Sequence, residues 1–226
     1  LYSFQGQKRV INLRPGKLNI ITGKSTTGKT SIIEIIDYCL GSSDCRIPEG
    51  VIRQTVAWVG LRLQLQAGQA FVARRLPDSG ADQTEDIYYE IANTLKIPEG
   101  EVLQKNSNLK ATIGMLSRHA GIGENQHEPP EGQTRDPLTA TIKHALYFVF
   151  QKQTEVATER ILFHRQGEPF IPQSIKDVVP YFLGAVSDDY VEKSRRLRDL
   201  RRELKGHERN LAEHNAIRAV SYTHLR

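Results

Sequence analysis

The run GKSTTGKT, residues 23–30, has the residue types and the spacing that phosphate binding requires. It fits the pattern G-x-x-x-x-G-K-[ST], the phosphate-binding P-loop. Gly23 and Gly28 allow the backbone to turn tightly and to approach an anion closely. Lys29 is expected to reach the β- and γ-phosphates of a nucleotide, and the Thr30 hydroxyl is expected to ligate Mg²⁺. The sequence therefore predicts an ATP site with Mg²⁺ at this loop.

The predicted nucleotide contacts extend over the whole loop and the start of the element that follows it. Backbone N–H groups of the loop and of a helix N-terminus would face the β-phosphate. Lys24 has two interpretations, a phosphate contact or an exposed loop lysine. The competing hypothesis, a glycine turn with an incidental lysine, is disfavoured by the flanking segments. The residues predicted to contact nucleotide are Gly23, Lys24, Ser25, Thr26, Thr27, Gly28, Lys29, Thr30 and Ser31.

The segments on either side of the loop have the pattern of a strand and a helix. Leu18, Ile20 and Ile21 form a short apolar run that predicts a buried strand. Residues 31–40 predict a helix, and Gly41 is placed to end it. On that helix, apolar residues cover most of the circumference, namely Ile32, Ile33, Ile35, Ile36, Cys39 and Leu40. The remaining face carries Ser31, Glu34, Asp37 and Tyr38.

Composition sets the broad class of the protein. The chain has 226 residues, 38% of them hydrophobic, and a net charge of +5, which predicts a globular protein of one large or two small domains. The sequence shows no apolar run of membrane-spanning length and no signal peptide, so we expect no membrane partner. Cys39 and Cys45 form no disulfide framework. These features predict a cytoplasmic protein in a reducing compartment.

Alternating apolar residues and turn signals predict an antiparallel β portion around the P-loop. Strands are predicted over residues 1–4, 9–13, 56–65, 69–76 and 87–91, with a hairpin turn at Ala67-Gly68. Trp58 is expected to pack in the core or against a sheet face. Residues 108–120 predict a helix, and the Gly- and Pro-rich residues 121–137 predict a surface loop.

A glutamine follows directly after the apolar residues 138–150, which predict a buried helix, either alone or passing into a strand. In a nucleotide-binding head, such a glutamine can reach Mg²⁺ and the attacking water. Gln151 is favoured over Gln153 as the sensing, catalytic and metal-binding residue, and an exposed boundary residue is the alternative. Further along, residues 155–160 are predicted to be helical, and residues 175–183 supply apolar surface.

The C-terminal segment differs from the rest of the chain in its charge and in the spacing of its apolar residues. Residues 191–220 hold nine Lys/Arg and five Asp/Glu. Leucines at 197, 204 and 211 are spaced by seven, and Leu200 occupies a d position, so the segment predicts the root of a coiled coil. Its basic residues either contact DNA phosphates or form a solvated face.

The last seven residues, 220–226, depart from this heptad pattern. They look like the translated end of a sequencing adapter, so they are interpreted as a non-native scar, with a frayed natural helix end as the alternative. We accordingly expect a longer protein. The predicted domains are an ATP-binding lobe at 1–150, a glutamine-boundary and helical region at 151–187, the start of a coiled coil at 188–219, and the scar at 220–226.

These motifs, in this order, resemble the N-terminal half of the SMC-like ABC ATPase heads, which include the RecF and RecN proteins. The runs ITGKSTTGKT, IDYCLG and IPEGVIR are most similar to an uncharacterised bacterial family of such ATPases, associated with mobile-element and phage-defence loci, whereas the wider group includes double-strand-break repair ATPases. The chain departs from the usual P-loop of these heads, which carries Asn-Gly where Ser25-Thr26 stand here. The resemblance implies an α/β P-loop fold with an antiparallel β portion and an emerging coiled-coil helix.

The resemblance also implies a mechanism and partners. Two heads would sandwich two ATP molecules, and hydrolysis would open the heads and move the coiled coils on DNA. The signature motif and the catalytic glutamate would come from the protein's own C-terminal half, so the 226 residues alone are expected to bind ATP weakly and not to hydrolyse it. Two alternatives remain open, another P-loop enzyme of the kinase or helicase type, and a coiled-coil scaffold whose P-loop is vestigial.

Overall fold

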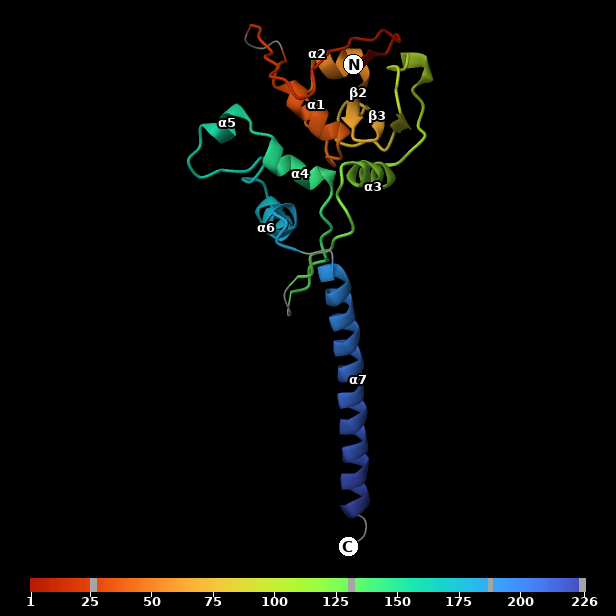
Figure 1. The fold of residues 1–226 in the computed structure, drawn as a ribbon, viewed down its shortest axis with the longest axis vertical. Helices are drawn as coiled ribbons and strands as arrows, with labels where there is room; N and C mark the ends of the chain where they lie inside the picture. The colour runs from red at the N-terminus through yellow and green to blue at the C-terminus, as the bar shows by residue number, and fades with distance from the viewer. Residues whose placement is uncertain (25–27, 130–132, 187–188, 224–226) are drawn as a thin grey trace.

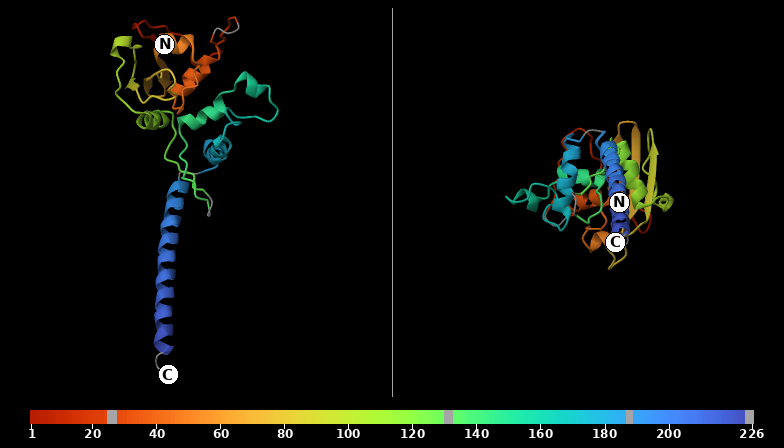
Figure 2. Two further views of the ribbon diagram at one scale, coloured as in Figure 1. Left: turned by 180° about the vertical axis from the view of Figure 1, so that it is seen from behind. Right: turned by 90° about the horizontal axis from the view of Figure 1, so that it is seen from below.

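The computed structural model describes residues 1–24, 28–129, 133–186 and 189–223, and on the last helix it describes side chains only at 190, 192–194 and 196–215. It shows a head of mixed α/β structure from which one long helix, α7 (Asp189–Thr223), extends (Figure 1). The views in Figure 2 show that α7 points away from the head along its whole length. With 35 residues, this helix is about 52 Å long at 1.5 Å per residue.

A four-stranded antiparallel sheet forms the centre of the head. Its strands follow chain order: β1 (Tyr2–Ser3), β2 (Val56–Leu65), β3 (Gly68–Arg75) and β4 (Ile87–Ala92). Leu65 pairs with Gly68 across the β2–β3 hairpin, and Gly68 has a φ of 125°, which favours glycine. The predicted strands at 56–65, 69–76 and 87–91 are therefore confirmed to within a residue or two.

The sheet separates two clusters of buried side chains. One face of β2 presents Val59, Leu61, Leu63 and Leu65 to the larger cluster, which includes residues of the helix after the P-loop. On the opposite face, Phe71 and Ala73 of β3 pack with Tyr2, and Trp58 lies against this second cluster. Trp58 thus packs against a sheet face, as its surroundings in the sequence predict.

The remaining elements surround this sheet. They are α1 (Ser31–Cys39), α2 (Val51–Thr55), a 3₁₀ turn η1 (Gly100–Val102), α3 (Leu109–His119), α4 (Ile142–Val149), α5 (Gln153–Val156) and α6 (Ile171–Phe182). The predicted helices at 31–40 and 108–120 are confirmed, and the Asn108 side chain caps α3 by accepting from the Ala111 N–H at 2.9 Å. The helix predicted at 155–160 is wrong, because α5 begins and ends earlier. Phe150 is already extended, so α4 ends just before Gln151.

The N-terminal segments differ most from the prediction. Residues 9–13 and 18–21 form no strand, and of the described strands none pairs with them. Leu18 is 86% exposed and Ile20 is 75% exposed. The buried strand predicted before the P-loop is therefore wrong for this chain. An apolar run has the propensity for a strand, but a strand also needs a neighbouring strand to satisfy its backbone.

Helix α1 buries its polar face more fully than its isoleucines. Ser31, Glu34, Asp37 and Tyr38 are buried, whereas Ile32, Ile33, Ile35 and Ile36 are only half-buried. Tyr38 is completely buried, and its hydroxyl donates to the Arg75 carbonyl at 3.1 Å. The polar stripe of α1 therefore faces protein, and the reason is a set of charged partners described below.

Helix α7 carries the leucines of the predicted heptad on its surface. Leu197, Leu200, Leu204 and Leu211 are between 45% and 62% exposed. The helix continues through Val220 to Thr223, and residues 224–226 lie outside the described part of the chain. None of the described helices has the length and apolar character to cross a membrane.

Candidate functional site

The P-loop leads directly into α1 through a turn that requires glycine. Gly28 has a φ of 78°, in the left-handed region that an L-residue enters only at a cost. Ser31 N–H then donates to the Gly28 carbonyl at 3.1 Å, and Ile32 N–H to the Lys29 carbonyl at 3.2 Å, so the first turn of the helix starts at the loop itself. Thr30 is the N-cap, and its side chain makes no capping hydrogen bond. The predicted contacts Ser25, Thr26 and Thr27 lie outside the described residues.

The Lys29 side chain folds back over the loop. Its ammonium donates to the Gly23 carbonyl at 2.9 Å and also to the Lys24 carbonyl. This brings the positive charge beside the turn at Gly28, where backbone N–H groups of the helix start also point. The contribution of Gly23 in this structure is its carbonyl, which accepts a hydrogen bond from Lys29.

A cavity of about 970 Å³ opens at this end of α1. Its walls come from four parts of the chain: the N-terminal residues, the P-loop end of α1, the segment at 48–56 that includes α2, and Gln153 at the start of α5. Of the described residues that line it, Lys8, Arg9 and Lys29 are cationic and Glu49 is anionic. The volume lies within the range of small-molecule sites, and the surplus of cations suits an anionic ligand.

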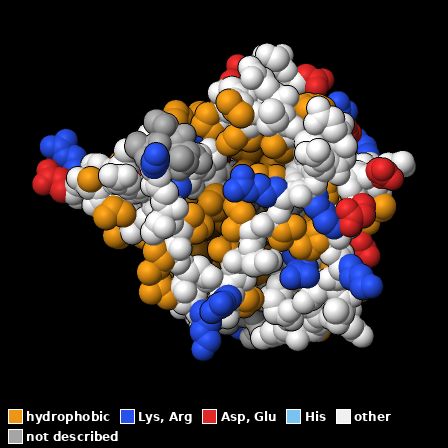
Figure 3. Space-filling model, turned by 90° about the horizontal axis from the view of Figure 1, so that it is seen from above, with side chains coloured by type: hydrophobic (Ala, Val, Ile, Leu, Met, Phe, Trp, Pro, Cys, Tyr) orange, Lys and Arg blue, Asp and Glu red, His pale blue; other side chains and the backbone are white. Residues whose placement is uncertain are grey.

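The surface around this end of the molecule is both apolar and basic. Seen from above, exposed hydrophobic side chains cover much of the face, and lysine and arginine side chains lie across it (Figure 3). Lys8 is partly engaged already, because its ammonium forms an ion pair with Glu99 and donates to the Ile97 carbonyl at 3.4 Å.

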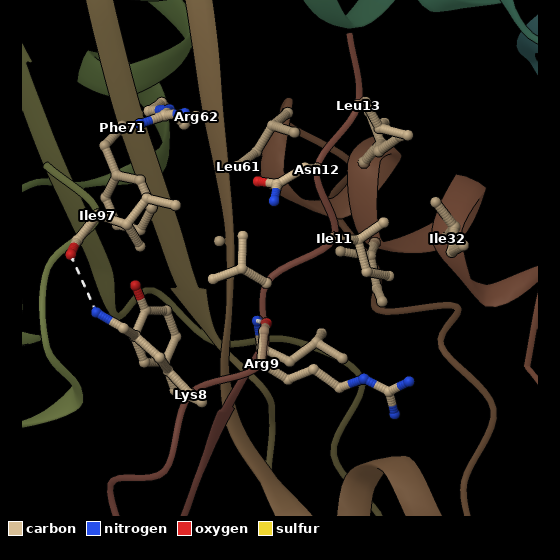
Figure 4. Close-up of a pocket in the computed structure, with 16 residues that line it drawn as sticks. Lys8, Arg9, Ile11, Asn12, Leu13, Ile32, Leu61, Arg62, Phe71 and Ile97 are labelled. Carbon is tan, nitrogen blue, oxygen red and sulfur yellow. Dashed lines mark hydrogen bonds between the residues drawn. The ribbon is translucent and has the colours of Figure 1, made fainter. Parts of the chain in front are cut away.

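A second, smaller cavity of about 180 Å³ adjoins the first one. It lies between residues 8–13, α1 and β2, and Figure 4 shows Ile11, Leu13, Ile32 and Leu61 around it. The apolar face of α1 therefore borders a gap at the open side of the head. This explains why the isoleucines of α1 remain half-exposed.

The two candidate glutamines occupy different places. The Gln151 amide donates to the Leu162 carbonyl at 3.1 Å. Gln151 is not among the described residues that line the larger cavity. Gln153, the first residue of α5, does line that cavity together with Lys29 and Thr30. The structure thus brings Gln153 to the P-loop, whereas the sequence favours Gln151.

The buried polar stripe of α1 is paired with the segment that follows Gln151. Lys152 Nζ lies 2.6 Å from Glu34 Oε1, and Arg165 Nη1 lies 3.6 Å from Asp37 Oδ2. Sequence reasoning missed these contacts because the partners are more than a hundred residues apart. A signal was present, since four polar residues at helical spacing interrupt an otherwise apolar helix.

Glu155 links the two charged pairs. Its carboxylate accepts from Lys152 N–H at 2.7 Å and from Arg165 N–H at 2.8 Å, and it lies 3.0 Å from the His164 ring. Burial by itself would raise the pKa of Glu155, but these hydrogen bonds outweigh it and hold the pKa below its usual value. Glu155 therefore remains ionised and keeps residues 152 and 165 together.

Comparison with known proteins identifies one family. Residues 2–218 match the family model described as an AAA domain. No match was found among curated proteins or among solved structures. The matched range covers nearly the whole chain, including the P-loop, the sheet and most of α7. The chain therefore belongs to the AAA domain family and is an AAA-type P-loop ATPase domain.

Proposed function

We propose that this chain is the ATP-binding half of an SMC-like ABC ATPase head. The observation that carries the proposal is the 970 Å³ cavity that Lys29, Thr30 and Ser31 line together with Gln153, the first residue of α5. The order of P-loop, antiparallel strands, glutamine and long helix supports the same assignment. In the full-length protein, ATP hydrolysis would drive head dimerisation and movement of the coiled coils on DNA.

The residues present fit ATP with Mg²⁺. The backbone at Gly28 is open to a phosphate, because a Cβ there would meet only Ile52 Cδ1, at 3.8 Å. Lys29 would bind the β- and γ-phosphates, and the Thr30 hydroxyl and the Gln153 amide oxygen would hold Mg²⁺. The metal, when bound, neutralises charge on the phosphates. Gln153 takes the sensing role in this proposal because it borders the cavity.

The exposed apolar segments support a larger head. Residues 9–13 and 18–21 present Val10, Ile11, Leu18 and Ile20 to solvent, and an exposed apolar patch commonly marks an interface. We infer that the protein's own C-terminal half covers this side and that a second head completes the ATP site. The leucine stripe of α7 would pack against a returning helix, and the basic residues of α7 would face DNA.

The test is ATP binding by the 226-residue chain and its Lys29→Ala variant, measured by titration with a fluorescent ATP analogue with and without Mg²⁺. We expect the variant to lose affinity at least about tenfold, because hydrogen bonds to charged groups contribute roughly 1.5–3 kcal/mol. Lys17→Ala is the matched control, since Lys17 is exposed on the segment before the loop. Equal binding by wild type and Lys29→Ala would contradict the proposal and favour a scaffold with a vestigial P-loop.

A further inference from the structure

Gln153 reaches the nucleotide cavity from a short segment with little packing of its own. Helix α5 has four residues, Gln153–Val156, and none of them is buried. Side chains of such a segment need anchors elsewhere in the fold to stay at one place. The residue immediately before Gln153 supplies such an anchor.

Lys152 joins this segment to the P-loop helix. Its ammonium lies 2.6 Å from Glu34 Oε1, and the two side chains are 22% and 11% exposed. Glu34 follows Thr30 by four residues on a helix, so it lies one turn along the same face. The pair therefore connects the residue beside Gln153 to the helix that starts at the phosphate-binding loop.

A second anchor holds the other end of the same segment. Arg165 Nη1 lies 3.6 Å from Asp37 Oδ2, three residues after Glu34 on α1. Glu155 accepts from the N–H groups of both Lys152 and Arg165, so the two anchors are tied to each other. The segment from 152 to 165 is thus attached at two points to the polar face of α1.

Because the two carboxylates are buried, the ion pairs favour one position of the segment 152–165 on α1. Glu34 is 9% exposed and Asp37 is 2% exposed. If the segment moved away, each carboxylate would lose its cation, and breaking a largely buried ion pair is strongly unfavourable. The two pairs therefore resist displacement of the segment and with it of Gln153.

Lys152 does not act on the ligand directly. It is not among the residues that line the larger cavity, and its ammonium is engaged by Glu34. Its adjacent residue, Gln153, lines that cavity together with Lys29 and Thr30. Any effect of Lys152 on nucleotide binding would therefore pass through the position of Gln153.

We propose that Lys152 is a positioning residue for the ATP site: its ion pair with Glu34 holds Gln153 at the cavity beside Lys29 and Thr30. The proposal rests on the proposed function, in which Gln153 contributes to Mg²⁺-dependent binding. In this proposal, the polar stripe of α1 links the phosphate-binding loop to Gln153.

The experiment compares Lys152→Met, Gln153→Ala and the double variant in the 226-residue chain. ATP affinity is measured with Mg²⁺ and with a chelator in its place. We expect each single variant to lose roughly tenfold in Mg²⁺-dependent affinity, the low end of losses for residues that orient a metal ligand, while metal-free ATP binding stays unchanged. The double variant should lose no more than either single one, because both changes remove the same contact.

Two variants separate positioning from general structure. Lys152→Arg retains the charge beside Glu34 and should restore most of the Mg²⁺-dependent affinity, and Lys110→Met, at an exposed position on α3, should change nothing. Hydrogen exchange without nucleotide gives an independent readout, in which Lys152→Met should speed exchange of the amides of residues 152–156. Losses that add in the double variant, or an unchanged exchange rate, would overturn the proposal.

The outcomes also distinguish this inference from the proposed function. If ATP binding depends on Lys29 but not on Lys152, the ATP site stands and the positioning role is wrong. If binding does not depend on Lys29, both the proposed function and the positioning role are wrong.

Discussion

The Arg74 guanidinium lies over the ring of Tyr38, with its central carbon 3.8 Å from the ring centre. Arg74 is 1% exposed and donates to the carbonyls of Tyr38 at 2.9 Å, Ser42 at 2.6 Å and Thr84 at 3.2 Å. Tyr38 lies in the last turn of α1 and Ser42 lies just beyond it, where the negative end of the helix dipole attracts positive charge. Arg74 therefore fastens the end of the P-loop helix to β3.

Replacing Arg74 by methionine should destabilise the fold by at least about 2 kcal/mol, because it leaves several buried carbonyls without their donor. The free energy of unfolding in urea, measured by circular dichroism, checks this prediction. Arg75→Met is the matched control, since Arg75 is the next residue on β3 and its side chain is 43% exposed. We expect that control to stay within about 0.5 kcal/mol of wild type, as is usual for surface substitutions. Equal losses in the two variants would show that the Arg74 contacts contribute nothing specific.

Gly28→Ala should weaken ATP binding through backbone strain. The added Cβ would meet only Ile52 Cδ1 at 3.8 Å, so space is available, but the φ of 78° costs an L-residue roughly 1–2 kcal/mol. Relief of that strain would reshape the loop at Lys29, and we expect ATP affinity to fall about tenfold. Gly114→Ala on α3 is the control, because nothing lies within 4 Å of its Cβ position and alanine favours a helix. If Gly28→Ala binds ATP like wild type, the loop does not need the left-handed turn for binding.

The apolar segment before the P-loop offers a direct comparison between the sequence and the structure. The sequence predicts a buried strand at 18–21, whereas Leu18 is 86% exposed in the structure. Leu18→Lys should therefore change the free energy of unfolding by no more than about 0.5 kcal/mol. Ile87→Ala, at a residue that is 1% exposed in β4, should cost about 2–5 kcal/mol in the same urea measurement. A loss of that size from Leu18→Lys would mean that the predicted strand forms after all.

The sheet could be predicted because its information is local. In β2, apolar residues alternate with other residues from Ala57 to Leu65, and a glycine with positive φ follows, so period and turn chemistry agree. The strand at 18–21 has the same kind of apolar residues. Whether residues 18–21 form a strand depends on a neighbouring strand, and the residues of the segment do not specify that neighbour.

The candidate site was only partly predictable for a similar reason. The P-loop pattern located Lys29 and Thr30, because their spacing is itself the signal. The buried face of α1 was not predictable, because Glu34 and Asp37 pair with Lys152 and Arg165, which lie far along the chain. Gln153 rather than Gln151 reaches the cavity because α4 ends at Val149 and the chain then runs extended, a boundary that no local pattern fixes to one residue.

His144 makes the stability of the head depend on pH. Its Nδ1 accepts from the Thr141 N–H at 3.0 Å at the start of α4, and this contact requires an unprotonated nitrogen. Burial, with a further contribution from Lys143, lowers the pKa of His144 from 6.5 to about 4. Between these two pH values, the unfolded chain binds a proton at this residue that the folded chain does not bind. Stability should therefore fall as the pH decreases from 6.5 to about 4, by about 3 kcal/mol at most.

His144→Gln tests this prediction without removing the cap, because glutamine at the third helical position also accepts from the N-cap backbone. Unfolding free energies of the variant should be nearly constant between pH 6.5 and 5, where those of wild type decline. The control is His119→Gln, at an exposed position at the end of α3. Its unfolding free energy should decline with falling pH as that of wild type does. The carboxylates of Glu155 and Asp177, whose pKa values hydrogen bonds lower despite burial, lose their contributions only below about pH 4.5. A wild-type slope retained in His144→Gln would place the pH dependence on another group.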